Sequence, residues 1–128
     1  MKMTKSLFAL SLVAAGLLMG GCKIYPPMDP RVTLADNAVG DVYVADVRCE
    51  KTAGNILTYQ VNVLNRTSSE LWLDWKGIWL DAAGQEIDSA VSTWNSLAVA
   101  PNDVKGLKGT APRAEAADMR FYVRRTVR

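Results

Sequence analysis

The sequence predicts an all-β fold: an immunoglobulin-like antiparallel β-sandwich of about seven or eight strands that follows a cleaved signal peptide. From residue 32 onwards, short runs of β-branched and aromatic residues are separated by turn-forming residues about every eight to twelve positions. Within several runs the apolar residues recur at every second position, which is the period of a half-buried strand. No stretch has a long helical period, so helices are not expected. A small closed barrel is the second architecture that fits this pattern.

Residues 1–21 are predicted to be a secretory signal peptide and not part of the fold. Lys2 and Lys5 precede an uncharged, mostly apolar run over residues 6–18, and small residues follow this run. The run is shorter than the ~20 apolar residues that a membrane-spanning helix needs. Residues 22–128 then remain, which is enough chain for one domain and too little for two.

The residues around Cys22 predict a lipid anchor. Leu17-Leu18-Met19-Gly20-Gly21-Cys22 resembles the lipobox of bacterial lipoproteins, in which small residues precede a Cys that is acylated and becomes the first mature residue. This resemblance implies that acyl chains on Cys22 attach the protein to a membrane. In lipoproteins of two-membrane bacteria, an Asp after this Cys commonly retains the protein in the inner membrane. If the host is such a bacterium, Lys23 implies the outer membrane, facing the periplasm. The alternative is an ordinary signal peptide that leaves Cys22 as an unmodified thiol.

Residues 22–31 are predicted to be a tether between the anchor and a sandwich domain formed by residues 32–128. The tether is poor in apolar residues and contains Pro26, Pro27 and Pro30, which favour an extended chain. Packing of its second half along the domain, as an irregular edge, is the alternative.

The strands of the domain are expected in eight segments. They are residues 32–34, 42–50, 57–64, 71–81, 85–91, a short run around Leu97 and Val99, 104–110 and 119–125. Segment 57–64 alternates strictly, with Leu57, Tyr59, Val61 and Val63 on its apolar face. In the last segment Met119, Phe121 and Val123 are expected to point inward. Gly84 is expected in the hairpin turn after residue 81, where a positive φ is needed, and residues 100–103 are expected to form a type I turn.

Segment 71–81 carries large apolar residues on both of its faces, so it is expected at the centre of a sheet. Leu71, Leu73, Trp75 and Trp79 share one face and are interpreted as core. Trp72, Asp74, Lys76, Ile78 and Leu80 share the other face. If this second face is exposed, it is an apolar patch that requires a partner. If it is the second buried face of a central strand, it has no functional meaning, and both readings remain open.

Four motifs along the chain resemble the YcfL-like family of small bacterial lipoproteins. They are Asn65-Arg66-Thr67, the spacing Trp75-x-x-x-Trp79-x-Asp81-x-x-Gly84, Ala111-Pro112, and the closing Met119-Arg120-Phe121-Tyr122-Val123. Together with the lipobox they cover nearly the whole chain. The chain departs from the family at Gly77, where a large aromatic is more usual. Because the biochemical role of the family is not established, the resemblance implies location and fold and not an activity.

The composition argues against several function classes. Lys2 and Lys5 are two of the 15 basic residues, so removal of the signal peptide leaves as many basic residues as the 13 acidic ones. A neutral domain has no strong electrostatic attraction to nucleic acid. The chain has no His, which excludes Ser-His-Asp and Cys-His nucleophile systems and the commonest zinc sites. No cofactor motif or metal-binding spacing is present, so no cofactor and no metal are expected.

The remaining reactive groups favour structural roles. Asp81 and Asp88 could approach each other across a hairpin and serve a small hydrolase, which is a remote alternative, since Asp81 as a turn former explains the pattern better. Cys49, the only cysteine besides Cys22, lies on an expected strand and is interpreted as an inert core thiol and not as a redox group.

The expected function is therefore non-catalytic binding of an envelope protein partner, with the biochemical role unknown. The candidate partner-binding residues are Trp72, Ile78, Leu80, Tyr122 and Arg124. The alternative is a module that binds peptidoglycan or another glycan, with Trp72, Trp94 or Tyr122 as stacking platforms. A second copy of the chain also remains open as a partner. The arginines at 120, 124, 125 and 128 fit either an acidic partner or lipid headgroups, or a solvated strand edge.

Overall fold

The computed structural model describes residues 25–89 and 92–127. The predicted signal peptide, the predicted anchor residue Cys22 and Lys23 lie outside the described residues. Among the described residues there is no helix, and the chain forms seven strands. These are β1 (Val32–Leu34), β2 (Val42–Lys51), β3 (Leu57–Asn65), β4 (Leu71–Leu80), β5 (Asn95–Val99), β6 (Val104–Thr110) and β7 (Asp118–Arg125).

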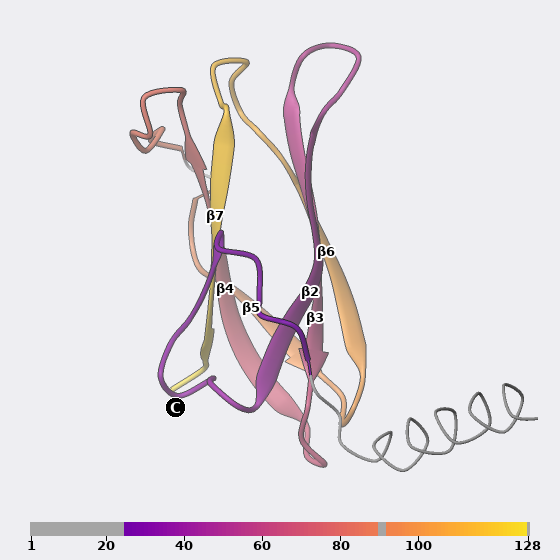
Figure 1. The fold of residues 1–128 in the computed structure, drawn as a ribbon. Coiled ribbons are helices and arrows are strands. Elements are labelled where there is room, and N and C mark those ends of the chain that lie inside the picture. The colour runs from indigo at the N-terminus through magenta and orange to yellow at the C-terminus, as the bar shows by residue number, and fades with distance from the viewer. Residues whose placement is uncertain (1–24, 90–91, 128) are drawn as a thin grey trace, which may run out of the picture.

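The strands form two sheets that face each other, as Figure 1 shows. The four-stranded sheet has the order β1-β7-β4-β5 and the three-stranded sheet has the order β2-β3-β6. All neighbours are antiparallel except β1 and β7, which pair in parallel. Only the β2–β3 and β4–β5 connections stay within one sheet. The predicted all-β sandwich is confirmed.

The core lies between the sheets, and on β3, β4 and β7 it is built from the alternating residues that the sequence predicted. On β4 and β7, Leu71, Leu73, Trp79, Met119, Phe121 and Val123 are buried, and on β2 and β3, Val42, Val44, Leu57, Tyr59, Val61 and Val63 are buried. Trp75 is half-buried and stacks on Phe121, with ring centroids 5.7 Å apart. Each large apolar side chain stabilises the fold by about 1.5–3 kcal/mol when it leaves water.

The expected strand over residues 85–91 is wrong for the residues that are described. The turn itself forms, since Gly84 has a φ of 81° and the Asp81 amide donates to the Gln85 carbonyl. Pairing then stops after an isolated bridge between Leu80 and Glu86 and one bond from the Ile87 amide to the Trp79 carbonyl. The turn-favouring residues Asp88 and Ser89 follow directly, so the chain leaves the edge of β4.

The turn between β5 and β6 also differs from the prediction. Asn102, the third residue of the turn, has a φ of 57°, whereas a type I turn needs a negative φ there. The Asp103 amide still donates to the Ala100 carbonyl. This geometry is that of a type II turn, which Asn tolerates better than most residues because it readily adopts the left-handed region.

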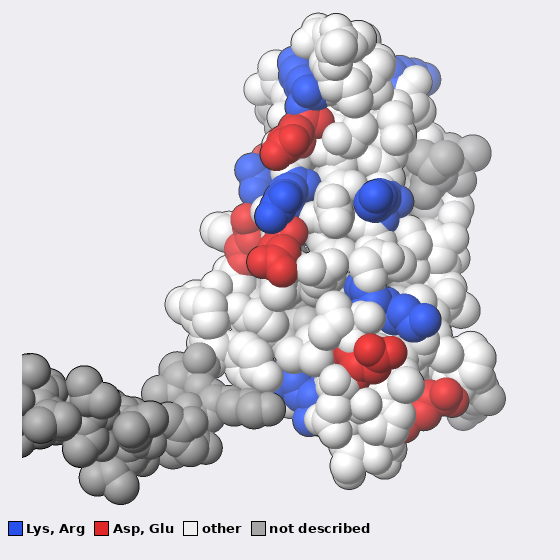
Figure 2. Space-filling view, turned by 90° about the vertical axis from the view of Figure 1, so that its right-hand side faces the viewer, with Lys and Arg blue, Asp and Glu red and all other residues white. Residues whose placement is uncertain are grey.

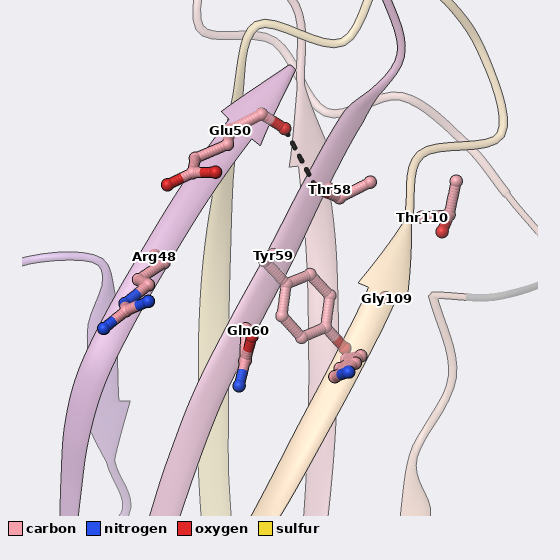
Figure 3. Close-up of a pocket in the computed structure, with 8 residues that line it drawn as sticks. Arg48, Glu50, Thr58, Tyr59, Gln60, Gly109 and Thr110 are labelled. Atoms are coloured by element: carbon pink, nitrogen blue, oxygen red, sulfur yellow. Dashed lines mark hydrogen bonds between the residues drawn. The ribbon is translucent and has the colours of Figure 1, made fainter. Parts of the chain in front are cut away.

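Two glycines make room for the ring of Tyr59 between the sheets. Figure 3 shows this ring leaning from β3 across β6 at Gly109, its cross-strand partner. A Cβ on Gly109 would lie 2.2 Å from a carbon of the ring. On the opposite sheet, a Cβ on Gly77 would lie 3.3 Å from the same ring. A large side chain at position 77 would therefore meet the ring of Tyr59.

Asn65 is a fully buried polar residue at the end of β3. Its side-chain amide donates to the carbonyls of Ser69, Val99 and Ala100, at 2.7, 3.0 and 3.1 Å. Its side-chain oxygen accepts from the amide and the hydroxyl of Thr67. The motif Asn65-Arg66-Thr67 thus fastens the β3–β4 connection to the end of β5, because one side chain satisfies backbone groups from both.

The second cysteine, Cys49, packs half-buried against the core from β2. Burial raises the pKa of its thiol, so the reactive thiolate is disfavoured.

Candidate functional site

The outer face of the four-stranded sheet gathers the candidate partner-binding residues. Alternate residues of β4 and β7 point away from the core on this face: Trp72, Asp74, Lys76, Ile78 and Leu80 on β4, and Arg120, Tyr122 and Arg124 on β7. The register of β4 and β7 places Lys76 opposite Tyr122. All five residues predicted to bind a partner therefore share one face.

This face is exposed and is not a second buried layer. Trp72 is 44% exposed, and Ile78, Leu80 and Tyr122 are half-buried. The sheet has the core on one side only, so its outer residues meet solvent. The sequence left open whether this face is exposed or is the second buried face of a central strand, and in the structure it is exposed.

A network of hydrogen bonds and ion pairs centres on Asp74 in the middle of the face. Its carboxylate accepts from the hydroxyl of Thr126 at 2.8 Å, from Nε of Arg124 at 3.2 Å and from the hydroxyl of Ser96 at 3.4 Å. The bond from Thr126, followed by those from Arg124 and Ser96, lowers the pKa of Asp74, although partial burial opposes this. Asp74 is therefore a firmly ionised group that orients Arg124.

Trp94 lies over this network and contacts two cations. The Arg124 guanidinium carbon is 3.8 Å from the centroid of the Trp94 ring, and Nζ of Lys76 is 4.8 Å from it. Nζ of Lys76 is also 5.7 Å from the centroid of the Tyr122 ring. Such cation–π contacts contribute about 0.5–1 kcal/mol each at exposed sites. Among the described residues, Lys76 is in no ion pair.

The sequence reasoning missed the roles of Lys76 and Trp94 in this cluster. Lys76 had a signal, since it alternates with Trp72 and Asp74 on the same face of β4. Trp94 was considered only as a stacking platform for a glycan; its contacts with Lys76 and Arg124 had no signal, because Trp94 precedes β5 in a connection whose path only the tertiary structure determines. We call Asp74, Lys76, Trp94, Tyr122 and Arg124 the cation–aromatic cluster.

The outer face of the three-stranded sheet has a different character. Figure 2 shows basic and acidic residues interspersed over it, without a field of one sign. On this face a shallow pocket of about 280 Å³ lies over β2, β3 and β6. It is lined by Arg48, Glu50, Thr58 and Lys108 among others (Figure 3). The Thr58 hydroxyl donates to the Glu50 backbone carbonyl. The pocket offers polar contacts but no activated nucleophile.

The acidic pair considered from the sequence does not form a catalytic arrangement. One carboxylate oxygen of Asp81 accepts from the backbone amides of Ala83 and Gln85, both at 2.9 Å. Asp81 therefore caps its own turn, while Asp88 is exposed. Within residues 25–89 and 92–127, no group of three or more Cys, Asp or Glu side chains could hold a metal ion. In the same part of the chain no helix is long and apolar enough to cross a membrane.

Comparisons with known proteins agree on a family and a fold. The family model for DUF1425, a protein of unknown function, matches residues 31–125. The crystal structure of a DUF1425 family member from Shewanella sp. PV-4 is similar, with a TM-score of 0.62 and 23% identity over 68% of this chain and 80% of that chain. The crystal structure of cj0090 from Campylobacter jejuni has a TM-score of 0.66 and 19% identity over 77% of this chain and all of that chain.

No curated protein matches this chain. The two structural similarities support the sandwich fold alone, while the family model covers β1 to β7, including the cation–aromatic cluster. This chain therefore belongs to the DUF1425 family, whose function is unknown.

Proposed function

We propose that this protein is a non-catalytic lipoprotein of the bacterial cell envelope that binds another protein through the outer face of its four-stranded sheet. Acyl chains on Cys22 hold it on the outer membrane, facing the periplasm. The lipobox, Lys23 and the resemblance to the YcfL-like lipoproteins support the anchor. The observation that carries the binding function is the cation–aromatic cluster beside the exposed side chain of Trp72.

The composition of this face fits a protein partner. Trp, Tyr and Arg are the residues that most often dominate the binding energy of protein interfaces. Trp72, Trp94, Tyr122 and Arg124 lie together here, next to the half-buried Ile78 and Leu80. The ammonium of Lys76 has aromatic neighbours but no ion pair among the described residues, so a carboxylate of the partner is its expected contact.

The glycan-binding alternative fits this face less well. A sugar ring stacks on the open face of an aromatic side chain. The guanidinium of Arg124 already lies 3.8 Å from the centroid of Trp94. Lys76 lies over both Trp94 and Tyr122. Sedimentation of the protein with purified sacculi separates the two functions, because a glycan-binding module pellets with them and a protein-binding module stays in solution.

The anchor is tested by the intact mass of the protein extracted from membranes, compared with a Cys22→Ser variant. A chain that begins at Cys22 and carries several acyl chains, with the variant unprocessed, is the expected result. A clipped chain without acyl groups contradicts the anchor.

The binding face is tested by a photo-crosslinking residue at Ser96, an exposed position of β5 opposite Asp74. A crosslinker at Gln60, exposed on the other sheet, is the matched control. We expect a protein adduct of one defined mass from position 96 only. Lys76→Glu is expected to abolish this adduct, whereas Lys108→Glu, on the three-stranded sheet, leaves it intact. Equal adducts from both faces, or an adduct insensitive to Lys76→Glu, contradict the proposal.

A further inference from the structure

Residues 25–31, which we call the strap, are fastened to the sandwich by specific contacts. The hydroxyl of Tyr43 on β2 donates to the Pro26 carbonyl at 2.8 Å. The rings of Tyr25 and Tyr43 have centroids 4.6 Å apart. The guanidinium of Arg66 lies 4.5 Å from the centroid of the Tyr25 ring, on the ring's face.

The strap begins on the outer face of the three-stranded sheet. Val42 and Val44 of β2 point into the core, so Tyr43 between them points outward, yet it is only 9% exposed. Pairing in the sheet places Tyr43 opposite Leu64. A groove of about 670 Å³ lies between the strap and this sheet, lined by Pro26, Met28, Leu64 and Val104 among others. Tyr43 is thus covered by the strap itself.

The strap then crosses to the four-stranded sheet along one side of the sandwich, as the indigo trace in Figure 1 shows. Met28 packs against the core on the way. Nε of Arg31 donates to Asp118 of β7 at 3.0 Å, and its NH1 group pairs with Asp29. The strap is therefore held at both of its ends, on different sheets.

The covalent distance from the anchor residue to the strap is short. Tyr25 is only three positions after Cys22, and a fully extended chain spans at most about 10 Å over three residue steps. The backbones of stacked sheets alone lie about 10 Å apart, and side chains add to the thickness on both outer faces. A link of this length cannot reach from the three-stranded sheet around the sandwich to the outer face of the four-stranded sheet.

We infer that the strap fixes the orientation of the domain: the three-stranded sheet is the side nearer the membrane, and the cation–aromatic cluster points away from it. This inference rests on the proposed anchor at Cys22. It deepens the proposed function, because it excludes lipid headgroups as the ligand of Arg124, Lys76 and Trp94. The partner is a protein that approaches from the periplasm, and not from the bilayer.

The orientation is measured on the acylated protein in lipid vesicles that carry an energy acceptor on their headgroups. A donor dye is attached to a single cysteine at Gln60 or at Ser96, with Cys49→Ser removing the native thiol. Both positions are exposed; Gln60 is the fourth residue of β3 on the three-stranded sheet, and Ser96 is the second residue of β5 on the four-stranded sheet. We expect higher energy transfer from Gln60 than from Ser96. Equal or reversed transfer overturns the inference.

Variants of the strap provide the second readout. Tyr25→Ala combined with Tyr43→Phe and Arg31→Ala removes the ring contacts, the bond to the Pro26 carbonyl and the ion pairs of the strap, and is expected to abolish the difference between the two labels. Arg113→Ala changes an exposed arginine in the β6–β7 connection and is expected to preserve it. A difference that survives in the strap variant also overturns the inference, because the strap would then not set the orientation.

The two proposals fail in distinguishable ways. If the protein does not associate with vesicles, the anchor is refuted. Docking of the strap is then read separately in solution, from nuclear Overhauser contacts between the rings of Tyr25 and Tyr43. Vesicle association without these ring contacts refutes the strap and leaves the anchor intact.

Discussion

Replacing Gly109 with alanine is expected to destabilise the sandwich, because the new Cβ would overlap the ring of Tyr59. The Cβ position is 2.2 Å from Cε1, 2.6 Å from Cζ and 2.8 Å from the hydroxyl oxygen of this ring. Ordinary contacts between carbon atoms are about 3.5–4.0 Å, so the strand or the ring must move by more than about 1 Å.

The ring of Tyr59 packs against two other aromatic rings of the core. It lies 5.4 Å from Trp79 and 6.0 Å from Phe121, measured between ring centroids, and a Cβ on Gly77 would touch its other side. Overpacking of a core costs about 1–3 kcal/mol. Alanine recovers about 0.5–1 kcal/mol relative to glycine because the unfolded chain has less freedom to lose. The net loss is expected to be about 1–2 kcal/mol.

The matched control is Gly106→Ala on the same strand. Its Cβ would meet only the side-chain oxygen of Asn62, at 3.4 Å, so the entropic gain is expected to leave this variant equal to or slightly more stable than the parent. Chemical denaturation followed by tryptophan fluorescence measures both variants. Combining Gly109→Ala with Tyr59→Val is expected to give a coupling energy of about 1 kcal/mol or more. Equal stability of the two alanine variants would refute the reasoning.

Three further outcomes are expected. Asn65→Ala is expected to lower the free energy of unfolding by about 2–4 kcal/mol in denaturation experiments, because the backbone groups that bond to Asn65 lose their hydrogen-bond partner. The control Asn62→Ala, at a half-buried position, is expected to lower it by about 1 kcal/mol or less. Burial raises the pKa of Tyr59 from 10.0 to about 12, so the folded state retains the phenolic proton to a higher pH than the unfolded state does. Stability should therefore fall between pH 10 and 12 in the parent more than in Tyr59→Phe. Because the pKa of Asp74 is lowered in the folded state, the ionised carboxylate stabilises the fold at neutral pH, and this stabilisation is lost as pH falls through that pKa. The free energy of unfolding of Asp74→Asn should therefore fall less in acid than that of the parent.

Alternation along single strands could be read from the sequence because it depends only on the backbone. Side chains of a strand point to opposite faces in turn, whatever the strand pairs with. The faces of residues 57–64, of β4 and of β7 were therefore predicted correctly, and with them the grouping of Trp72 with Ile78 and Leu80.

Features that depend on contacts between distant segments could not be read in this way. Asn65 is polar and stands beside turn-forming residues, so nothing local indicates that it is buried under the end of β5. The composition of residues 85–91 is compatible with a strand. After Ile87, however, the chain moves away from β4, so the residues that follow have no strand to pair with there. The position of Trp94 over Arg124 depends in the same way on how β5 returns beside β4.

The cation–aromatic cluster differs from a patch of exposed apolar residues because its charged side chains are already ordered. Binding costs about 0.5–1.5 kcal/mol for each flexible side chain that a partner immobilises. Arg124 contacts both Asp74 and Trp94, and Nζ of Lys76 lies over the rings of Trp94 and Tyr122. The conformational entropy of these side chains is therefore lost during folding and not when a partner binds. An ordered face of this kind favours one partner of matching shape and charge over many weak ones, and this is the property expected of a specific protein-binding surface.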